Sequence, residues 1–148
     1  MAVFSAAVLC VFYFAMSMNG LVLGNDPAIH LQRANTFLES GRIPISDVAW
    51  YPPLYHIILS TLIAFTGVSS FENMLSLMKL LTALVDWLLV FSVYLIGRSF
   101  SRKAGYIASI LMLVSFPIFE INFFGGYTSL LALAFIFLLF LFPLNVIF

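Results

Sequence analysis

The side chains that could do chemistry in this sequence are few, and two of them lie close together near the amino-terminus. Asp26 is followed four residues later by His30, and residues at this spacing share one face of a helix. Such a pair can hold one divalent cation or one phosphate, and the carboxylate can also act as a base. The alternative is that Asp26 is an N-cap and that His30 makes an interfacial hydrogen bond.

Lys79 and Asp86 are ionisable residues inside an otherwise apolar stretch. They are seven residues apart, so on a helix they share a face at a separation of about 10 Å. Ionisable groups inside a membrane span are costly and usually face the bundle interior or a water-filled cavity. We expect Lys79 to contact a lipid phosphate and Asp86 to pair with a polar group on another helix.

Three further features allow a functional and a structural interpretation. His56 either faces the same surface as His30 or bonds a backbone carbonyl. Glu120 either joins Asp26 in a cation site or is a solvated carboxylate. Gly125-Gly126, in the sequence FFGGYTS, allows close approach of a ligand to the backbone or forms a tight turn.

The composition indicates that membrane helices position these side chains. The 148 residues are 64% hydrophobic and 8% charged, with six basic and six acidic residues, whereas a soluble domain has roughly 25% charged residues. The sequence therefore predicts a polytopic membrane protein. Zero net charge argues against nucleic-acid binding, and a single cysteine cannot form an intrachain disulfide.

The first apolar stretch, Ala2–Gly24, is predicted to be a retained span. No Lys or Arg precedes it, unlike a signal peptide, and it would reach roughly 34 Å as a helix, enough to cross a bilayer core. Asn25-Asp26-Pro27 then predicts the start of a short amphipathic helix that ends at Gly41 and lies on the membrane surface.

The rest of the chain divides into apolar stretches and short connections. Leu54–Val68 is short for a span and equally suits a helix in the interface. Three stretches are predicted to cross the membrane, and Glu120–Ser129 is predicted to be a loop; the crossings are Asn73–Gly97, Ala104–Phe119 and Leu130–Phe148. The apolar carboxyl end suggests the amino-terminal portion of something larger, or a piece that needs partner helices.

The charge distribution orients these elements. Arg98, Arg102 and Lys103 form the most basic cluster, and the positive-inside tendency places it in the cytoplasm together with the amino-terminus. Residues 25–72 are then an external loop. We expect an all-α, multi-pass cell-membrane protein in which residues 1–148 form one transmembrane module of four full spans plus an external interfacial segment; five spans are the alternative. A small transporter would be expected to show an inverted repeat, and the sequence shows none.

The order of these features resembles the GT-C superfamily of membrane glycosyltransferases, especially the oligosaccharyltransferase catalytic subunit and related archaeal membrane proteins. There, a first span leads to an external Asp and a helix, as in GNDPAIHLQRANTFLESG. A YPP element with an amphipathic helix follows, as in YPPLYHIILSTLIAFTG. A span then ends in a basic turn, as in VYLIGRSFSRKAG, and a later span leads to an external loop, as in GGYTSLLALAF.

The resemblance implies sugar transfer from a polyprenyl-phosphate donor at the external face, with inversion and often with a divalent cation such as Mg or Mn. By position, Asp26 matches the catalytic acid of the first external loop, and Asp26 with Glu120 would bind the metal. The residues expected to bind substrate are His30, Lys79, Tyr51 and His56. Membrane lipids and additional transmembrane helices or subunits are the expected partners.

The sequence departs from the family pattern in two ways. The second external loop of the family carries DxD or DxE acids, where this chain has Tyr127-Thr128-Ser129, and family enzymes have many more spans and usually a further domain. We therefore expect a module that is incomplete on its own. The alternative is a non-catalytic subunit or degenerate fragment that packs in a larger membrane assembly.

Overall fold

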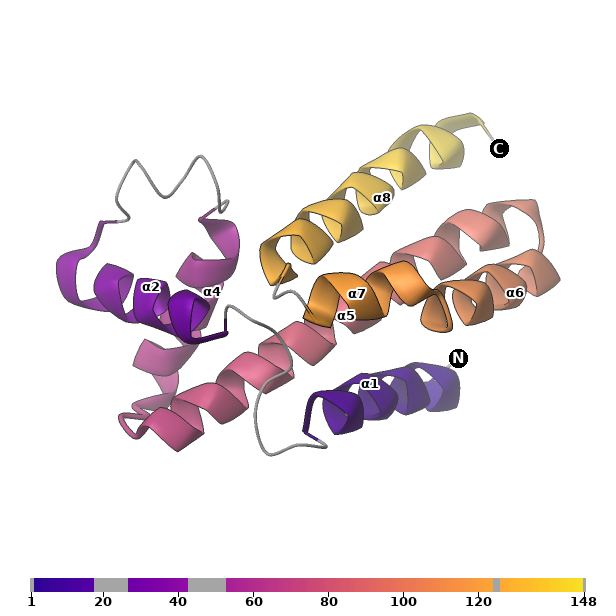
Figure 1. The fold of residues 1–148 in the computed structure, drawn as a ribbon. Coiled ribbons are helices and arrows are strands. Elements are labelled where there is room, and N and C mark those ends of the chain that lie inside the picture. The colour runs from indigo at the N-terminus through magenta and orange to yellow at the C-terminus, as the bar shows by residue number, and fades with distance from the viewer. Residues whose placement is uncertain (1, 18–26, 43–52, 124–125, 148) are drawn as a thin grey trace.

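The computed structural model describes residues 2–17, 27–42, 53–123 and 126–147, and within them the chain is helical with no strand (Figure 1). This confirms the predicted all-α class. The helices are α1 (Ala2–Ser17), α2 (Pro27–Ser40), α4 (Leu54–Thr66), α5 (Phe71–Phe100), α6 (Arg102–Leu113), α7 (Phe116–Phe123) and α8 (Tyr127–Ile147).

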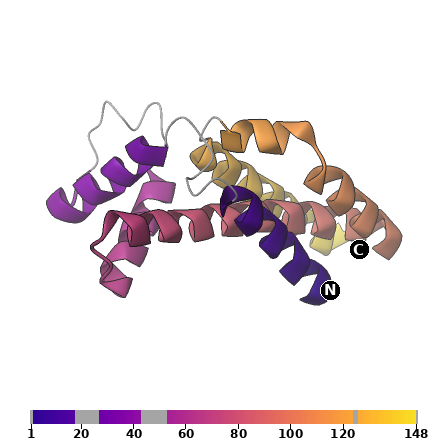
Figure 2. The ribbon, with the colours of Figure 1, turned by 60° about the horizontal axis from the view of Figure 1, so that its bottom comes forward.

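The 30-residue helix α5 is the centre of the structure. Helices α1, α6 and α8 pack along it, whereas α2 and α4 pack on each other beside its amino-terminal end (Figure 1). The amino-terminus of α1, the α5–α6 turn and the carboxyl end of α8 all lie at the opposite end (Figure 2). One end of the bundle therefore carries the α2–α4 pair, and the other carries the start of α1, the α5–α6 turn and the end of α8.

Among the described residues, α5 alone is long and apolar enough to cross a membrane by length and composition. Three other apolar helical segments are shorter; these are Phe4–Ala15, Leu54–Thr66 and Tyr127–Leu141. The predicted first span, Ala2–Gly24, is described only as far as Ser17. The structure thus shows one candidate span and not the four that the sequence predicts.

Glycines with a left-handed backbone conformation end helices α2 and α4. Gly41 follows α2 with a φ of 66° and donates from its backbone N–H to the carbonyl of Phe37 at 2.8 Å. Gly67 ends α4 with a φ of 67° and donates to Ile63 at 3.0 Å. Left-handed glycine is the commonest way to satisfy the last carbonyls of a helix, so the prediction that α2 ends at Gly41 is confirmed.

Helices α5 and α6 approach each other closely through two glycines. A Cβ on Gly97 would lie 2.9 Å from the carbonyl oxygen of Ala104, and one on Gly105 would lie 2.9 Å from that of Tyr94. Ser101 joins the helices in an extended conformation and caps α6 by accepting from the Ala104 N–H at 3.0 Å. Small residues at such crossings let backbones pack closely.

Gly105→Ala is therefore expected to destabilise the fold by about 1–3 kcal/mol, because the new methyl group meets backbone atoms that cannot rotate away. Reversible unfolding in mixed detergent and dodecyl sulfate micelles measures the change. Lys103→Ala is the control, because this exposed side chain should change stability by no more than about 0.5 kcal/mol. Equal effects of the two substitutions would contradict the close packing.

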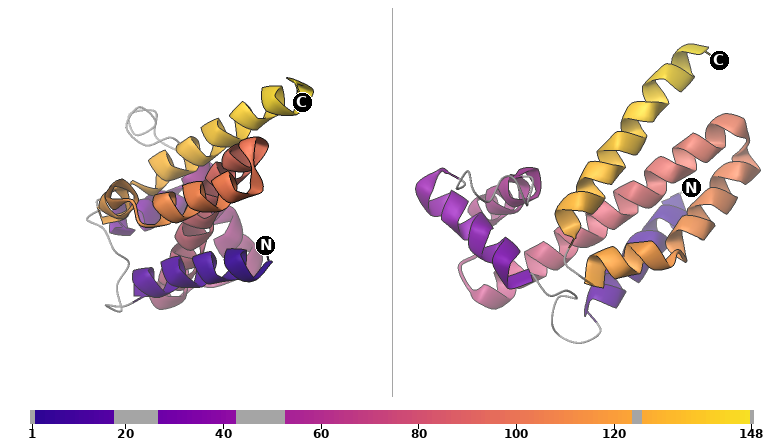
Figure 3. Two further views of the ribbon diagram at one scale, coloured as in Figure 1. Left: turned by 90° about the vertical axis from the view of Figure 1, so that its right-hand side faces the viewer. Right: turned by 45° about the horizontal axis from the view of Figure 1, so that its top comes forward.

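The stretch Ala104–Phe119, which is predicted to cross the membrane, is not one continuous helix. Helix α6 ends at Leu113 and α7 begins at Phe116, and the chain bends between them (Figure 3). Pro117 explains the break, because it has no N–H to donate to the carbonyl of Leu113 and its ring would clash with that carbonyl. The Ser115 N–H bonds the carbonyl of Met112 at 3.1 Å instead, which tightens the last turn of α6.

The predicted loop Glu120–Ser129 is also wrong at both ends. Helix α7 continues through Glu120 to Phe123, and α8 already begins at Tyr127. Gly126 lies directly before α8, where its N–H bonds the carbonyl of Ile121 at 2.8 Å and a Cβ would meet the Ile121 side chain at 2.5 Å. The close approach at this glycine is to the chain itself.

Candidate functional site

The two histidines of the chain, both expected to bind substrate, meet in the interior of the protein. His30 of α2 and His56 of α4 place Nδ1 and Nε2 at 2.9 Å from each other, and their rings stack with centroids 5.1 Å apart. Neither side chain has any exposed surface. One nitrogen of this contact must donate and the other must accept, so the pair joins α2 to α4 by a buried hydrogen bond.

Tyrosines from two other elements surround this pair. The His30 ring lies 5.7 Å from the ring of Tyr55 and 5.2 Å from that of Tyr127, which begins α8. The Tyr55 hydroxyl is 2.9 Å from Oγ1 of Thr82 on α5, and Thr82 donates its own hydrogen to the carbonyl of Met78. Tyr55 therefore donates to Thr82, and burial raises the pKa of the Tyr55 hydroxyl well above its ordinary value, which keeps it protonated.

We call the residues His30, Tyr55, His56, Thr82 and Tyr127 the histidine–tyrosine cluster. It draws one side chain each from α2, α5 and α8 and two from α4, and all five are buried. The cluster therefore fixes α2 and α4 against the long helix. Sequence reasoning missed Tyr55, Thr82 and Tyr127, although Tyr127 was visible as the aromatic residue directly after the glycine pair.

A second buried polar contact lies one helical turn further along α5. The Asn122 amide of α7 donates to both carboxyl oxygens of Asp86 at 3.0 Å. This confirms the prediction that Asp86 pairs with a polar group on another helix. Lys79, Thr82 and Asp86 follow one another at spacings of three and four residues and are all buried, so they form one polar face of α5.

Of the other predicted site residues, the structure describes Lys79 and Glu120. Glu120 is exposed on α7, and Asp26 and Tyr51 lie outside the described residues. Within residues 2–17, 27–42, 53–123 and 126–147, no group of three or more His, Cys, Asp or Glu side chains is arranged to hold a metal ion. A cation site formed by Asp26 and Glu120 stays a prediction.

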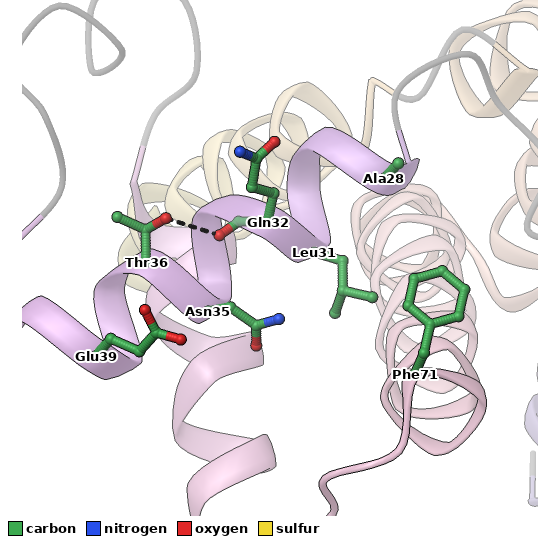
Figure 4. Close-up of a pocket in the computed structure, with 7 residues that line it drawn as sticks. All are labelled: Ala28, Leu31, Gln32, Asn35, Thr36, Glu39 and Phe71. Carbon is green, nitrogen blue, oxygen red and sulfur yellow. Dashed lines mark hydrogen bonds between the residues drawn. The ribbon is translucent and has the colours of Figure 1, made fainter.

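The outer face of α2 carries a surface recess that is open to a ligand (Figure 4). Its volume is about 410 Å³, and it lies between α2 and the first residue of α5. Its lining is mainly polar, with one aromatic ring; the residues are Ala28, Leu31, Gln32, Asn35, Thr36, Glu39 and Phe71. The polar members recur at the spacing of one helix face, which is the signal that could have located the recess from sequence.

The histidine contact should contribute measurably to stability. We expect His30→Leu and His56→Leu each to lower the free energy of unfolding by about 1–2 kcal/mol, because each leaves a buried ring nitrogen without its partner. The double variant should cost about as much as either single one. Unfolding in mixed micelles measures the stability of the two single variants and the double variant. Gln32→Leu, on the exposed face of α2, is the control. Fully additive losses would show that the two rings do not act together.

The fold and the site define an all-helical chain built around one long apolar helix, with a buried polar cluster at one end. Comparison with known protein families, curated proteins and solved structures finds no match to the chain.

Proposed function

We propose that the chain is a membrane-embedded module of a GT-C-like glycosyltransferase, which transfers a sugar from a polyprenyl-phosphate donor at the external membrane face. The observation that carries the proposal is the position of α2. This helix begins directly after Asp26, its inner face is bonded to α4 through the two buried histidines, and its outer face carries the open polar recess. Asp26 thus directly precedes a helix that is held in place beside a surface recess.

The proposed topology places α1, α5, α6–α7 and α8 across the bilayer. Exposed apolar side chains on three of them would face lipid, among them Phe14, Ile107 and Leu139, at 68%, 59% and 64% exposure. The amino-terminus and the basic α5–α6 turn lie at one end, which suits the cytoplasmic side. Helices α2 and α4 lie at the other end, which would be external.

The residues then have distinct proposed roles. Asp26 would take the proton from the acceptor hydroxyl while that oxygen bonds to the anomeric carbon and the bond to the polyprenyl phosphate breaks. A divalent cation held by Asp26 and Glu120 would stabilise charge on the leaving phosphate. Lys79, which keeps 9% exposure whereas the two histidines have none, would support that phosphate together with Tyr51. His30 and His56 are positioning residues, because their full burial keeps them from the substrate.

A non-catalytic membrane subunit is the second candidate function. The observation that favours it concerns Tyr127 and Thr128, which stand where the resembling family has its second acidic motif. They are buried at 0% and 5% exposure at the start of α8, so this segment packs against the protein itself. A subunit of this kind would copurify with neighbouring membrane proteins and show no transfer activity.

The deciding experiment is a transfer assay in membranes that contain the full chain and the neighbouring membrane proteins that copurify with it. A radiolabelled sugar on a polyprenyl phosphate is the donor, and membranes without the chain are the control. Transfer that depends on the chain and on Asp26 supports the transferase. Copurification without chain-dependent transfer overturns it and supports the subunit.

A further inference from the structure

The opposite end of the bundle holds a second recess, between the carboxyl-terminal turns of α5 and α8. Its volume is about 340 Å³, and its lining residues are Leu95, Arg98, Ser99 and Leu141. The Ser99 hydroxyl donates to the carbonyl of Ile96 at 2.7 Å, so its hydrogen is already used. Among the described residues, Arg98 is therefore the one charged group that lines this recess, and two leucines form its apolar part.

The charge around this recess is positive and is not compensated by the helices packed there. Arg98, Arg102 and Lys103 lie within six residues of one another and are exposed. Neither α6 nor α8 contains an acidic residue. The nearest acid on α5 is Asp86, twelve residues earlier, which is about 18 Å along the helix. Within the part of the chain that the structure describes, an anion placed here would meet attraction without a competing carboxylate.

We propose that this recess binds the phosphate headgroup of an anionic phospholipid. The Arg98 guanidinium offers two parallel N–H donors to the phosphate oxygens, while Leu95 and Leu141 would contact the first carbons of the acyl chains. Basic recesses between helices at the cytoplasmic surface are a recognised mode of lipid binding. The proposal rests on the membrane location of the chain and not on its transferase activity.

The occupant is a lipid and not a free phosphate because the recess combines a basic group with two leucines and adjoins exposed apolar residues. Phe100, Leu139 and Phe140 lie close in sequence to the lining residues and are 79%, 64% and 60% exposed. A soluble phosphate would satisfy Arg98 but leave this apolar surface in contact with water. A phospholipid covers both parts at once.

The test is lipid retention by the purified full chain in neutral detergent, measured by native mass spectrometry after addition of phosphatidylglycerol or phosphatidylcholine. The wild-type chain should retain phosphatidylglycerol about fivefold more than phosphatidylcholine, the factor expected from about 1 kcal/mol per basic residue. Arg98→Gln should abolish most of this preference. Lys103→Gln, which removes a charge at the same end but outside the recess, should retain it, as should Ser99→Ala.

Three outcomes would overturn the proposal. One is equal retention of the two lipids by the wild-type chain, and another is an equal loss in Arg98→Gln and Lys103→Gln, which would indicate diffuse attraction. The third is displacement of phosphatidylglycerol by inorganic phosphate, which would indicate a free-anion site. Arg98→Lys keeps the charge and should retain part of the preference, so the test does not depend on one variant. Sugar-transfer activity does not enter the readout, so the transferase proposal can fail separately.

Discussion

Replacing Asp26 by asparagine is expected to lower the rate of sugar transfer by roughly 10²–10⁴-fold in membranes that contain the complete assembly, the range for losing a general base. Asparagine keeps the size of the side chain and can still cap the start of α2. It cannot accept a proton from the acceptor hydroxyl, and it is a weaker ligand for a divalent cation. The variant should therefore have a lower turnover rate, whereas the amount of folded protein should be unchanged.

Glu72→Gln is the matched control for this variant. Glu72 is an exposed acid in the first turn of α5, on the same proposed external side, and its removal should change transfer by less than about twofold because it affects only the helix end. If Asp26→Asn kept turnover within the range of this control, the catalytic role would be withdrawn. The non-catalytic subunit would then be the better interpretation.

Asn122→Leu is expected to lower the free energy of unfolding by about 3 kcal/mol, the largest stability effect predicted for this chain. The substitution keeps the side chain close in volume but removes both hydrogen bonds to Asp86. The carboxyl group then stays buried without the amide donor that it has in the structure. Unfolding in mixed micelles, followed by circular dichroism, measures the change.

A second substitution tests whether the loss of stability comes from the buried Asp86 carboxyl group that has lost its hydrogen-bond donor. Asp86→Leu combined with Asn122→Leu should be more stable than Asn122→Leu alone, because an apolar pair leaves no buried polar group without a partner. A double variant that is less stable than Asn122→Leu would show instead that the loss comes from packing of α7. Leu80→Ala, on an exposed position of α5, provides the reference for an unrelated change on the same helix.

Local signals predicted the ends of single helices well. Pro27 and Gly41 mark α2 because each restricts the backbone in a way that suits one helix end. The same reasoning failed between α6 and α7. The run of apolar residues predicts one crossing there, but the missing N–H of Pro117 breaks the helix. The reasoning failed again at Tyr127, because the loop predicted over Glu120–Ser129 extends past the first residue of α8.

The candidate site was predicted only in part, for a different reason. The cost of a buried carboxyl group made it possible to predict that Asp86 would find a partner on another helix, but not that the partner would be Asn122. The contact between His30 and His56 depends on how α2 crosses α4, and no spacing within one helix encodes that crossing. Long-range contacts of this kind follow from packing and not from periodicity.

The length of α5 has a consequence for the depth of the site in the proposed topology. Its 30 residues span about 45 Å, whereas the hydrocarbon core measures about 30 Å. With Arg98 at the cytoplasmic headgroups, an untilted α5 would leave the hydrocarbon near Lys79, and its first turns would project into the outer headgroup layer. The α2 recess, which Phe71 lines at the start of α5, would then lie in that layer, where the lipid-linked donor and the water-soluble acceptor of the proposed reaction could meet.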